Sequence, residues 1–133
     1  MERDYAVLSK LAKHDFVMPI LGVGTSPNNL KVVVTEFAPL GSLEKVLQGV
    51  SMMGTTMEDA VRFEVGRQVC LGMRVLEQNR IVHRDLSAHN IMVFEFNHTN
   101  PKHIKVKVSG YGVAFTDGEG GDVIEVLGSA ASR

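Results

Sequence analysis

The chain has 133 residues, a formal net charge of −1 and 44% hydrophobic residues, which suffices for a core within at most one ordinary domain. This charge excludes a basic nucleic-acid-binding surface, and no apolar run reaches the roughly 18 to 20 residues of a membrane span. The charged start and the single cysteine, Cys70, predict a cytoplasmic protein with no secretory signal and no internal disulfide. Because Cys70 falls in a helical pattern, we expect it to be a packed core thiol.

Hydrophobic periodicity predicts the elements in chain order. Residues 2–13 have helical spacing, and residues 21–23 and 30–35 are expected to form strands joined by a turn at residues 26–29. Residues 58–78 give the longest helical signal, in which Gly72 would allow close approach of another element. Its apolar stripe consists of Val61, Val65, Val69, Met73 and Leu76. Residues 91–93 indicate a short buried strand, and residues 94–102 a polar loop.

The most informative stretch is I-V-H-R-D-L-S-A-H-N-I-M-V, residues 81–93. It matches the pattern H-R-D-L-x-x-x-N at His83, Arg84, Asp85, Leu86 and Asn90, and five fixed positions make a chance match rare. The chain therefore resembles the protein kinase family. The resemblance implies that Asp85 accepts the proton of a substrate hydroxyl and that Asn90 binds a Mg²⁺ ion between the nucleotide phosphates. It also implies that Arg84 meets a phosphorylated residue of the activation segment.

The resemblance implies an incomplete α+β fold of the protein-kinase type. Residues 1–36 correspond to a remnant of the small lobe, residues 37–41 to the hinge and residues 42–133 to the first part of the large lobe. That part would hold two helices, the catalytic loop, two strands and the start of the activation segment. In the family, a glutamate of the helix that matches residues 2–13 pairs with a lysine. Asp4 matches that glutamate best, and Glu2 less closely.

The segment V-V-V-T-E-F-A-P-L-G-S-L, residues 32–43, resembles the strand, hinge and helix start that hold the adenine of ATP in this family. By this resemblance Thr35 is the gatekeeper, and the Glu36 carbonyl and the Ala38 amide and carbonyl face the adenine edge. Met92 would form the floor beneath the base. The implied cofactors are ATP and Mg²⁺. A plain linker in which Ser42 caps the following helix is the alternative.

The pattern breaks at I-K-V-K-V-S-G-Y-G-V-A, residues 104–114, which align with the strand and D-F-G triplet that open the activation segment. Gly110 stands where the family has its metal-binding Asp, and Tyr111 replaces the Phe. Glycine offers no carboxylate to Mg²⁺, which stabilises the transition state of phosphoryl transfer. The Gly-rich loop and lysine of the family are also missing before residues 2–13. We therefore expect no detectable phosphoryl transfer by this chain.

Two further patterns bear on specificity and metals. Serine/threonine kinases usually place a Lys two residues after the catalytic Asp, and Ser87 stands there, which favours a tyrosine-kinase-like loop. His98 and His103 could suggest a metal pair, but no second pair of ligands is near in the sequence, so a solvated loop is favoured.

Three hypotheses remain open. The chain is part of an ATP-dependent tyrosine kinase, which could belong to the cytoplasmic part of a larger receptor. Alternatively, it is a pseudokinase that regulates or scaffolds a partner protein, or an incomplete gene product without independent activity. The expected partner is a protein, either substrate or regulated partner, and neither nucleic acid nor a membrane segment is expected.

Overall fold

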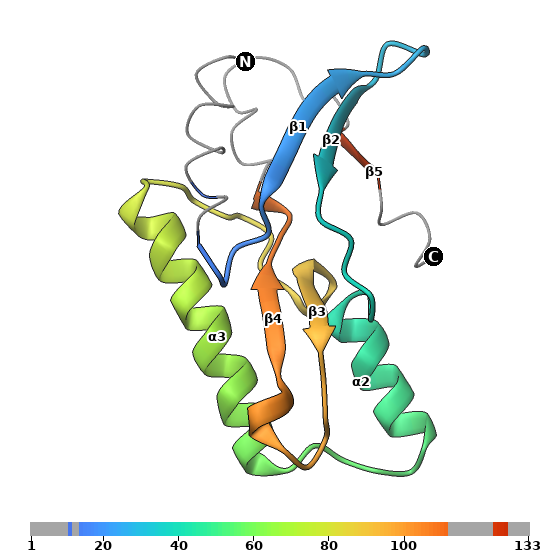
Figure 1. The fold of residues 1–133 in the computed structure, drawn as a ribbon, viewed down its shortest axis with the longest axis vertical. Coiled ribbons are helices and arrows are strands. Elements are labelled where there is room, and N and C mark those ends of the chain that lie inside the picture. The colour runs from blue at the N-terminus through green and yellow to red at the C-terminus, as the bar shows by residue number, and fades with distance from the viewer. Residues whose placement is uncertain (1–10, 12–13, 112–123, 128–133) are drawn as a thin grey trace.

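The computed structural model describes residue 11, residues 14–111 and residues 124–127. The expected helix at residues 2–13 lies outside the described residues, and so do Asp4 and Glu2. Its one described residue, Leu11, is helical and fully buried. Figure 1 shows a three-stranded sheet at one end of the molecule and a two-stranded hairpin at the other, with α3 and α2 on either side of the hairpin.

The three-stranded sheet has the order β1-β2-β5. Strands β1 (Ile20–Thr25) and β2 (Lys31–Thr35) run antiparallel, and a turn in which Asn29 has φ +63° joins them. This confirms both expected strands, because a run of β-branched residues fits a pleated surface. Strand β5 (Ile124–Leu127), which runs parallel to β2, was not predicted.

The hairpin consists of β3 (Ile91–Glu95) and β4 (Lys105–Val108). The polar loop begins later than expected, because β3 continues through Glu95, and it ends in the short 3₁₀ turn η2 (Pro101–His103). The chain before β1 adds a further strand-like contact, in which the Met18 N–H donates to the Val108 carbonyl at 2.8 Å. The hairpin is therefore covered on one edge by residues 16–18.

Helix α3 (Asp59–Gln78) confirms the expected long helix and packs along β4. Its buried line is shifted from the predicted stripe: Val69 and Met73 are half-buried, and the buried residues are Val61, Val65, Gln68, Gly72 and Leu76. A Cβ at Gly72 would lie 2.5 Å from the Phe16 carbonyl oxygen and 2.7 Å from Val108 Cγ2. The expected close approach at Gly72 is thus confirmed.

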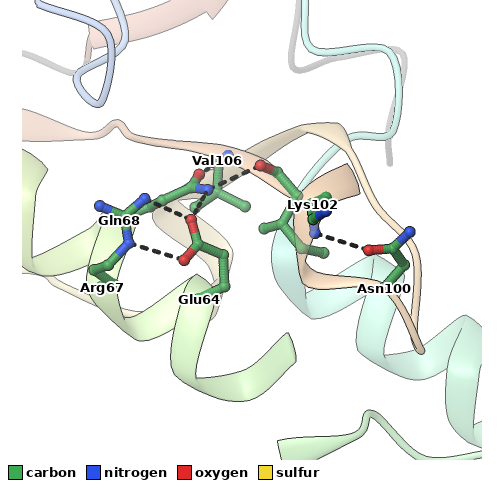
Figure 2. Close-up of polar contacts among 7 residues, drawn as sticks. Glu64, Arg67, Gln68, Asn100, Lys102 and Val106 are labelled. Carbon is green, nitrogen blue, oxygen red and sulfur yellow. Dashed lines mark hydrogen bonds and ion pairs between the residues drawn. The ribbon is translucent and has the colours of Figure 1, made fainter. Parts of the chain in front are cut away.

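Gln68 occupies the centre of this buried line as a polar residue, with 4% of its surface exposed. Its Oε1 accepts from the Val106 N–H at 2.9 Å (Figure 2). Its Nε2 donates to the Ile104 carbonyl at 2.8 Å. The side-chain amide therefore pairs with β4 as a neighbouring strand would, which satisfies two buried backbone groups.

Glu64 anchors the outer side of this contact. Its carboxylate accepts two hydrogen bonds from Arg67, at 2.6 and 2.8 Å, and one from Gln68 Nε2 at 2.8 Å (Figure 2). These donors, with Arg67 the stronger, lower the pKa of Glu64 to about 2. The ionised carboxylate in turn fixes the orientation of the Gln68 amide.

The prediction that Cys70 is a packed core thiol was wrong, because its side chain is exposed. Cys70 follows Gln68 by two residues, and positions two apart on a helix point to different sides. The face of α3 that carries Cys70 also exposes Phe63, at 83%. The helical pattern therefore predicted the helix correctly but assigned this residue to the wrong face.

Helix α2 (Leu43–Met52) begins where expected. The Ser42 hydroxyl caps it by accepting from the Lys45 N–H at 3.2 Å. Within the described residues, neither α2 nor α3 is both long and apolar enough to span a membrane.

Candidate functional site

The segment between α3 and β3 carries the predicted catalytic residues. It leaves the helix after Gln78, buries Ile81 and His83, and ends in the 3₁₀ turn η1 (Ala88–Asn90), which leads directly into β3. Arg84 adopts φ +71°, a left-handed conformation that non-glycine residues rarely take.

Asp85 and Asn90 lie side by side, as their spacing predicted. The Asn90 Nδ2 donates to the Asp85 carbonyl at 2.7 Å and to Asp85 Oδ2 at 3.1 Å. The amide therefore uses both of its N–H groups on Asp85, so its Oδ1 points elsewhere.

His83 connects this loop to the end of β4. The Asp85 N–H donates to His83 Nδ1 at 3.1 Å, so Nδ1 is the acceptor nitrogen and Nε2 carries the proton. The Nε2–H then donates to the Ser109 carbonyl at 2.5 Å. Through these two hydrogen bonds His83 connects the Asp85 backbone to Ser109 and has a structural role.

Ser109 and Gly110 complete this part of the site. The Ser109 N–H and hydroxyl both donate to the Asn90 carbonyl, each at 2.8 Å. Gly110 has φ +78°, and a Cβ on it would lie 2.5 Å from Asn90 Oδ1 and 2.6 Å from Asn90 Cγ. The Asn90 side chain therefore fills the space that a side chain at Gly110 would need. We call Asp85, Asn90, Ser109 and Gly110 the catalytic corner.

Tyr111 is held deep in the core next to this corner. It is 1% exposed, and its hydroxyl donates to the Met18 carbonyl. Burial raises the pKa of the Tyr111 phenol, so the group stays protonated and remains a donor. Sequence reasoning recognised the change from Phe to Tyr but could not supply this partner, which lies 93 residues away along the chain.

The predicted hinge groups are partly paired within the chain. The Thr35 hydroxyl donates to the Glu36 carbonyl at 3.1 Å, and the Gly41 N–H donates to the Ala38 carbonyl at 3.1 Å. Three backbone groups are predicted to form hydrogen bonds with the adenine: the Glu36 carbonyl, the Ala38 carbonyl and the Ala38 N–H. Of these, the Ala38 N–H has no hydrogen-bond partner among the described residues.

Strand β3 joins the hinge to the catalytic corner. The Val93 N–H donates to the Gly41 carbonyl at 2.8 Å, and the Leu40 N–H donates to the Val93 carbonyl at 3.2 Å. Met92 forms an isolated bridge with Ser42 and is half-buried. Asn90, the predicted metal ligand, ends η1 directly before β3, and Met92, the predicted adenine floor, is the second residue of β3.

Lys107 was missed by the sequence analysis. It is 8% exposed, its Nζ lies 3.1 Å from Glu36 Oε2, and it sits 4.7 Å from the centre of the Phe94 ring. This ion pair ties Glu36, which directly precedes the predicted hinge, to β4 across 71 residues of sequence. The signal available in the sequence was a lysine between the two valines of β4, which reads K-V-K-V.

The described residues contain no group of three or more His, Cys, Asp or Glu side chains arranged to hold a metal ion. His103 lies 2.8 Å from Glu95, an exposed pair at the hairpin loop. At the catalytic corner the side chains of Asp85, Asn90 and Ser109 carry oxygen atoms, and Gly110 adds none. Asp85 supplies the one carboxylate of the corner, whereas Mg²⁺ is usually held by one or two carboxylates together with phosphates and water.

The order of strands β1 and β2, helices α2 and α3, the loop that carries Asp85 and Asn90, and the hairpin of β3 and β4 is consistent with a partial α+β fold of the protein-kinase type. The family model of protein tyrosine and serine/threonine kinases matches residues 1–121. The chain belongs to this protein kinase family, as its sequence resemblance indicated.

Several curated relatives agree. The chain is 34% identical over 117 residues to "Activated Cdc42 kinase-like" of Drosophila melanogaster, covering 88% of this chain and 8% of that protein. It is 34% identical to "Serine/threonine-protein kinase STY46" of Arabidopsis thaliana, covering 86% of this chain and 18% of that protein. It is also 30% identical to "Ack-related non-receptor tyrosine kinase" of Caenorhabditis elegans, covering 90% and 10% respectively. The chain thus spans less than a fifth of each of these three relatives.

Proposed function

We propose that this chain does not transfer phosphate itself and acts as a pseudokinase-type module that binds and regulates a partner protein. The observation that carries the proposal is the position of the Asn90 amide. It donates to Asp85 and lies against Gly110, in the space where a metal-binding Asp would stand.

The chemistry of the family explains why this arrangement matters. Phosphoryl transfer depends on positioning and on neutralising charge with Mg²⁺, and the protein does little covalent chemistry. A general base alone contributes about 10²- to 10⁴-fold. Asp85 therefore cannot replace the missing cation, and its carboxylate already accepts a hydrogen bond from Asn90.

A second candidate is a tyrosine kinase whose remaining parts belong to a longer protein. It is supported by the exposed Asp85 and by the similarity to the named tyrosine kinase of Caenorhabditis elegans. A kinase of this kind uses ATP and Mg²⁺ as cofactors. The Ala38 N–H would donate to the adenine, with Thr35 behind the base, the Glu36 carbonyl at its edge and Met92 beneath it.

Transfer of radiolabelled phosphate from ATP to a mixed tyrosine- and serine-containing peptide pool tests the proposal. We expect the purified chain to give the same signal as its Asp85→Asn variant, because neither holds the cation. Transfer by the unaltered chain that is lost in Asp85→Asn would refute the proposal and support the second candidate. Equal unfolding temperatures of the two proteins serve as the control for folding.

A further inference from the structure

Lys107 lies on the face of the β3–β4 hairpin that carries the predicted adenine floor. The antiparallel pairing places Lys107 directly opposite Met92, and residues paired in this way point to the same face of a sheet. Only 8% of the Lys107 surface is exposed, and its ammonium group lies 4.7 Å from the centre of the Phe94 ring. A cation largely shielded from water therefore stands beside the place where a base is predicted to bind.

The carboxylate of Glu36 balances this cation. Its Oε2 lies 3.1 Å from Lys107 Nζ, and the side chains of Lys107 and Glu36 are 10% and 40% exposed. Desolvation offsets much of the attraction in a shielded ion pair, so such a pair adds little net stability compared with apolar residues of the same size. The main effect of the pair is to fix the position of Glu36, the residue that leads from β2 into the hinge.

The hinge is tied to the hairpin at both of its ends. Figure 1 shows the chain between β2 and α2 running beside β3, where backbone hydrogen bonds join Leu40 and Gly41 to Val93. At the end near β2, the contact is the ion pair of Glu36 with β4. Ala38, which is predicted to meet the adenine edge, lies between these two contacts and is 4% exposed. Strand β3 therefore holds one end of the hinge, and a β4 side chain holds the other.

We propose that Lys107 is a positioning residue for an adenine base at the hinge, and that it acts through Glu36. The ion pair fixes the start of the hinge backbone, so that the Glu36 carbonyl and the Ala38 N–H keep the spacing that a purine edge requires. Without the pair, the Glu36 carboxylate turns to water and the hinge loses its anchor on β4. The inference rests on adenine-nucleotide binding as in the second candidate function, and it uses no residue of the catalytic corner.

Lys107→Met separates this role from a general effect on folding. It removes the charge and keeps an apolar side chain of similar length in the shielded position. The Glu36 carboxylate that it leaves unpaired is 40% exposed, so we expect the variant to fold. Lys105→Met, at an exposed position two residues earlier on β4, removes the same charge and is the matched control.

The first readout is the backbone order of the hinge, measured by NMR relaxation. An order parameter of about 0.85 marks rigid backbone, and one below about 0.6 marks flexible backbone. We expect the order parameter of Ala38 to fall toward the lower value in Lys107→Met and to stay unchanged in Lys105→Met. Leu40 should keep its order in both variants, because its N–H donates to the Val93 carbonyl of β3.

The second readout is the affinity for adenosine, which tests recognition of the base without phosphates or their cation. Titration followed by the amide shifts of the hinge gives the dissociation constant. We expect Lys107→Met to bind adenosine about tenfold more weakly than the unaltered chain, because the hinge must then be ordered on binding. Lys105→Met should bind as the unaltered chain does. Adding Glu36→Gln to Lys107→Met should cause no further loss, because both changes remove one interaction.

Three results would overturn the proposal, and they can be told apart. Equal affinities of the unaltered chain and Lys107→Met would remove the role of Lys107 and leave base binding intact. Additive losses in the double variant would show that Lys107 does not act through Glu36. No binding of adenosine to the unaltered chain would count against the second candidate function as well.

Discussion

Two regions of the molecule contact β4 or the residues that directly follow it, and each combines a glycine with a side-chain amide. We call the first the seam, formed by Gln68 and Gly72 of α3 where they meet β4; the second is the catalytic corner, with Asn90 and Gly110. A Cβ on either glycine would lie 2.5 Å from an oxygen atom. At Gly72 that oxygen belongs to the Phe16 backbone, whereas at Gly110 it is the end of the Asn90 side chain.

Because of this difference, Gly72 is required by the fold, whereas Gly110 can be replaced. Backbone packed against a helix cannot move without disturbing the core, because protein interiors are close-packed. A side-chain amide can rotate, at the cost of its hydrogen bonds to Asp85. The seam therefore specifies the fold, while the catalytic corner can be rebuilt by substitution. The predictions below test this contrast, from the largest expected effect to the smallest.

Gln68→Leu should have the largest effect on stability. It removes the partners of the Val106 N–H and the Ile104 carbonyl inside the core. Each of the two unsatisfied buried groups costs about 1–3 kcal/mol, so we expect the free energy of unfolding to fall by about 2–6 kcal/mol. Urea unfolding measures the change. Gln78→Leu, at the exposed end of the same helix, is the control and should stay within about 0.5 kcal/mol of the unaltered chain. Similar small effects from both variants would mean that the seam does not hold β4.

Gly72→Ala should destabilise the protein by about 1–2 kcal/mol, because overpacking outweighs the better helix propensity of Ala. Gly66→Ala is the matched control in the same helix, where a Cβ would meet nothing within 4 Å. At Gly66 only the higher helix propensity of Ala acts, so we expect the free energy of unfolding to rise by about 0.5–1 kcal/mol. Thermal unfolding of both variants checks the opposite signs. A gain in stability for Gly72→Ala would contradict the close packing.

The smallest effect concerns pH. The pKa of Glu64 is lowered from 4.5 to about 2 in the folded chain, so its stabilising contribution is present above pH 4.5 and is lost as the pH falls toward 2. We expect Glu64→Gln to lose less stability than the unaltered chain over that interval. Asp59→Asn removes a carboxylate that is 98% exposed and leaves the Glu64 contacts intact, so it should retain the original acid sensitivity. Identical acid profiles for all three proteins would exclude this role for Glu64.

Much of this architecture could be predicted from local patterns. The catalytic-loop spacing predicted the neighbouring positions of Asp85 and Asn90, and helical periodicity predicted α3. Long-range partners were not predictable, because no local pattern reveals what a side chain meets across the fold. The amide of Gln68 on β4 and the ion pair between Lys107 and Glu36 are of this kind. Strand β5 was missed because its four residues follow a stretch rich in Gly and acid, which favours a loop.

The central claim is that Gly110 deprives the catalytic corner of its cation. The most direct test is the shift of the unfolding temperature on adding Mg²⁺ with ATP to three proteins: the unaltered chain, Gly110→Ala and Gly110→Asp. Both substitutions displace Asn90, but only Gly110→Asp adds a carboxylate. We predict that Mg²⁺ with ATP stabilises Gly110→Asp alone, beyond the effect of ATP without Mg²⁺. A Mg²⁺-dependent shift in the unaltered chain as large as that in Gly110→Asp would contradict the claim.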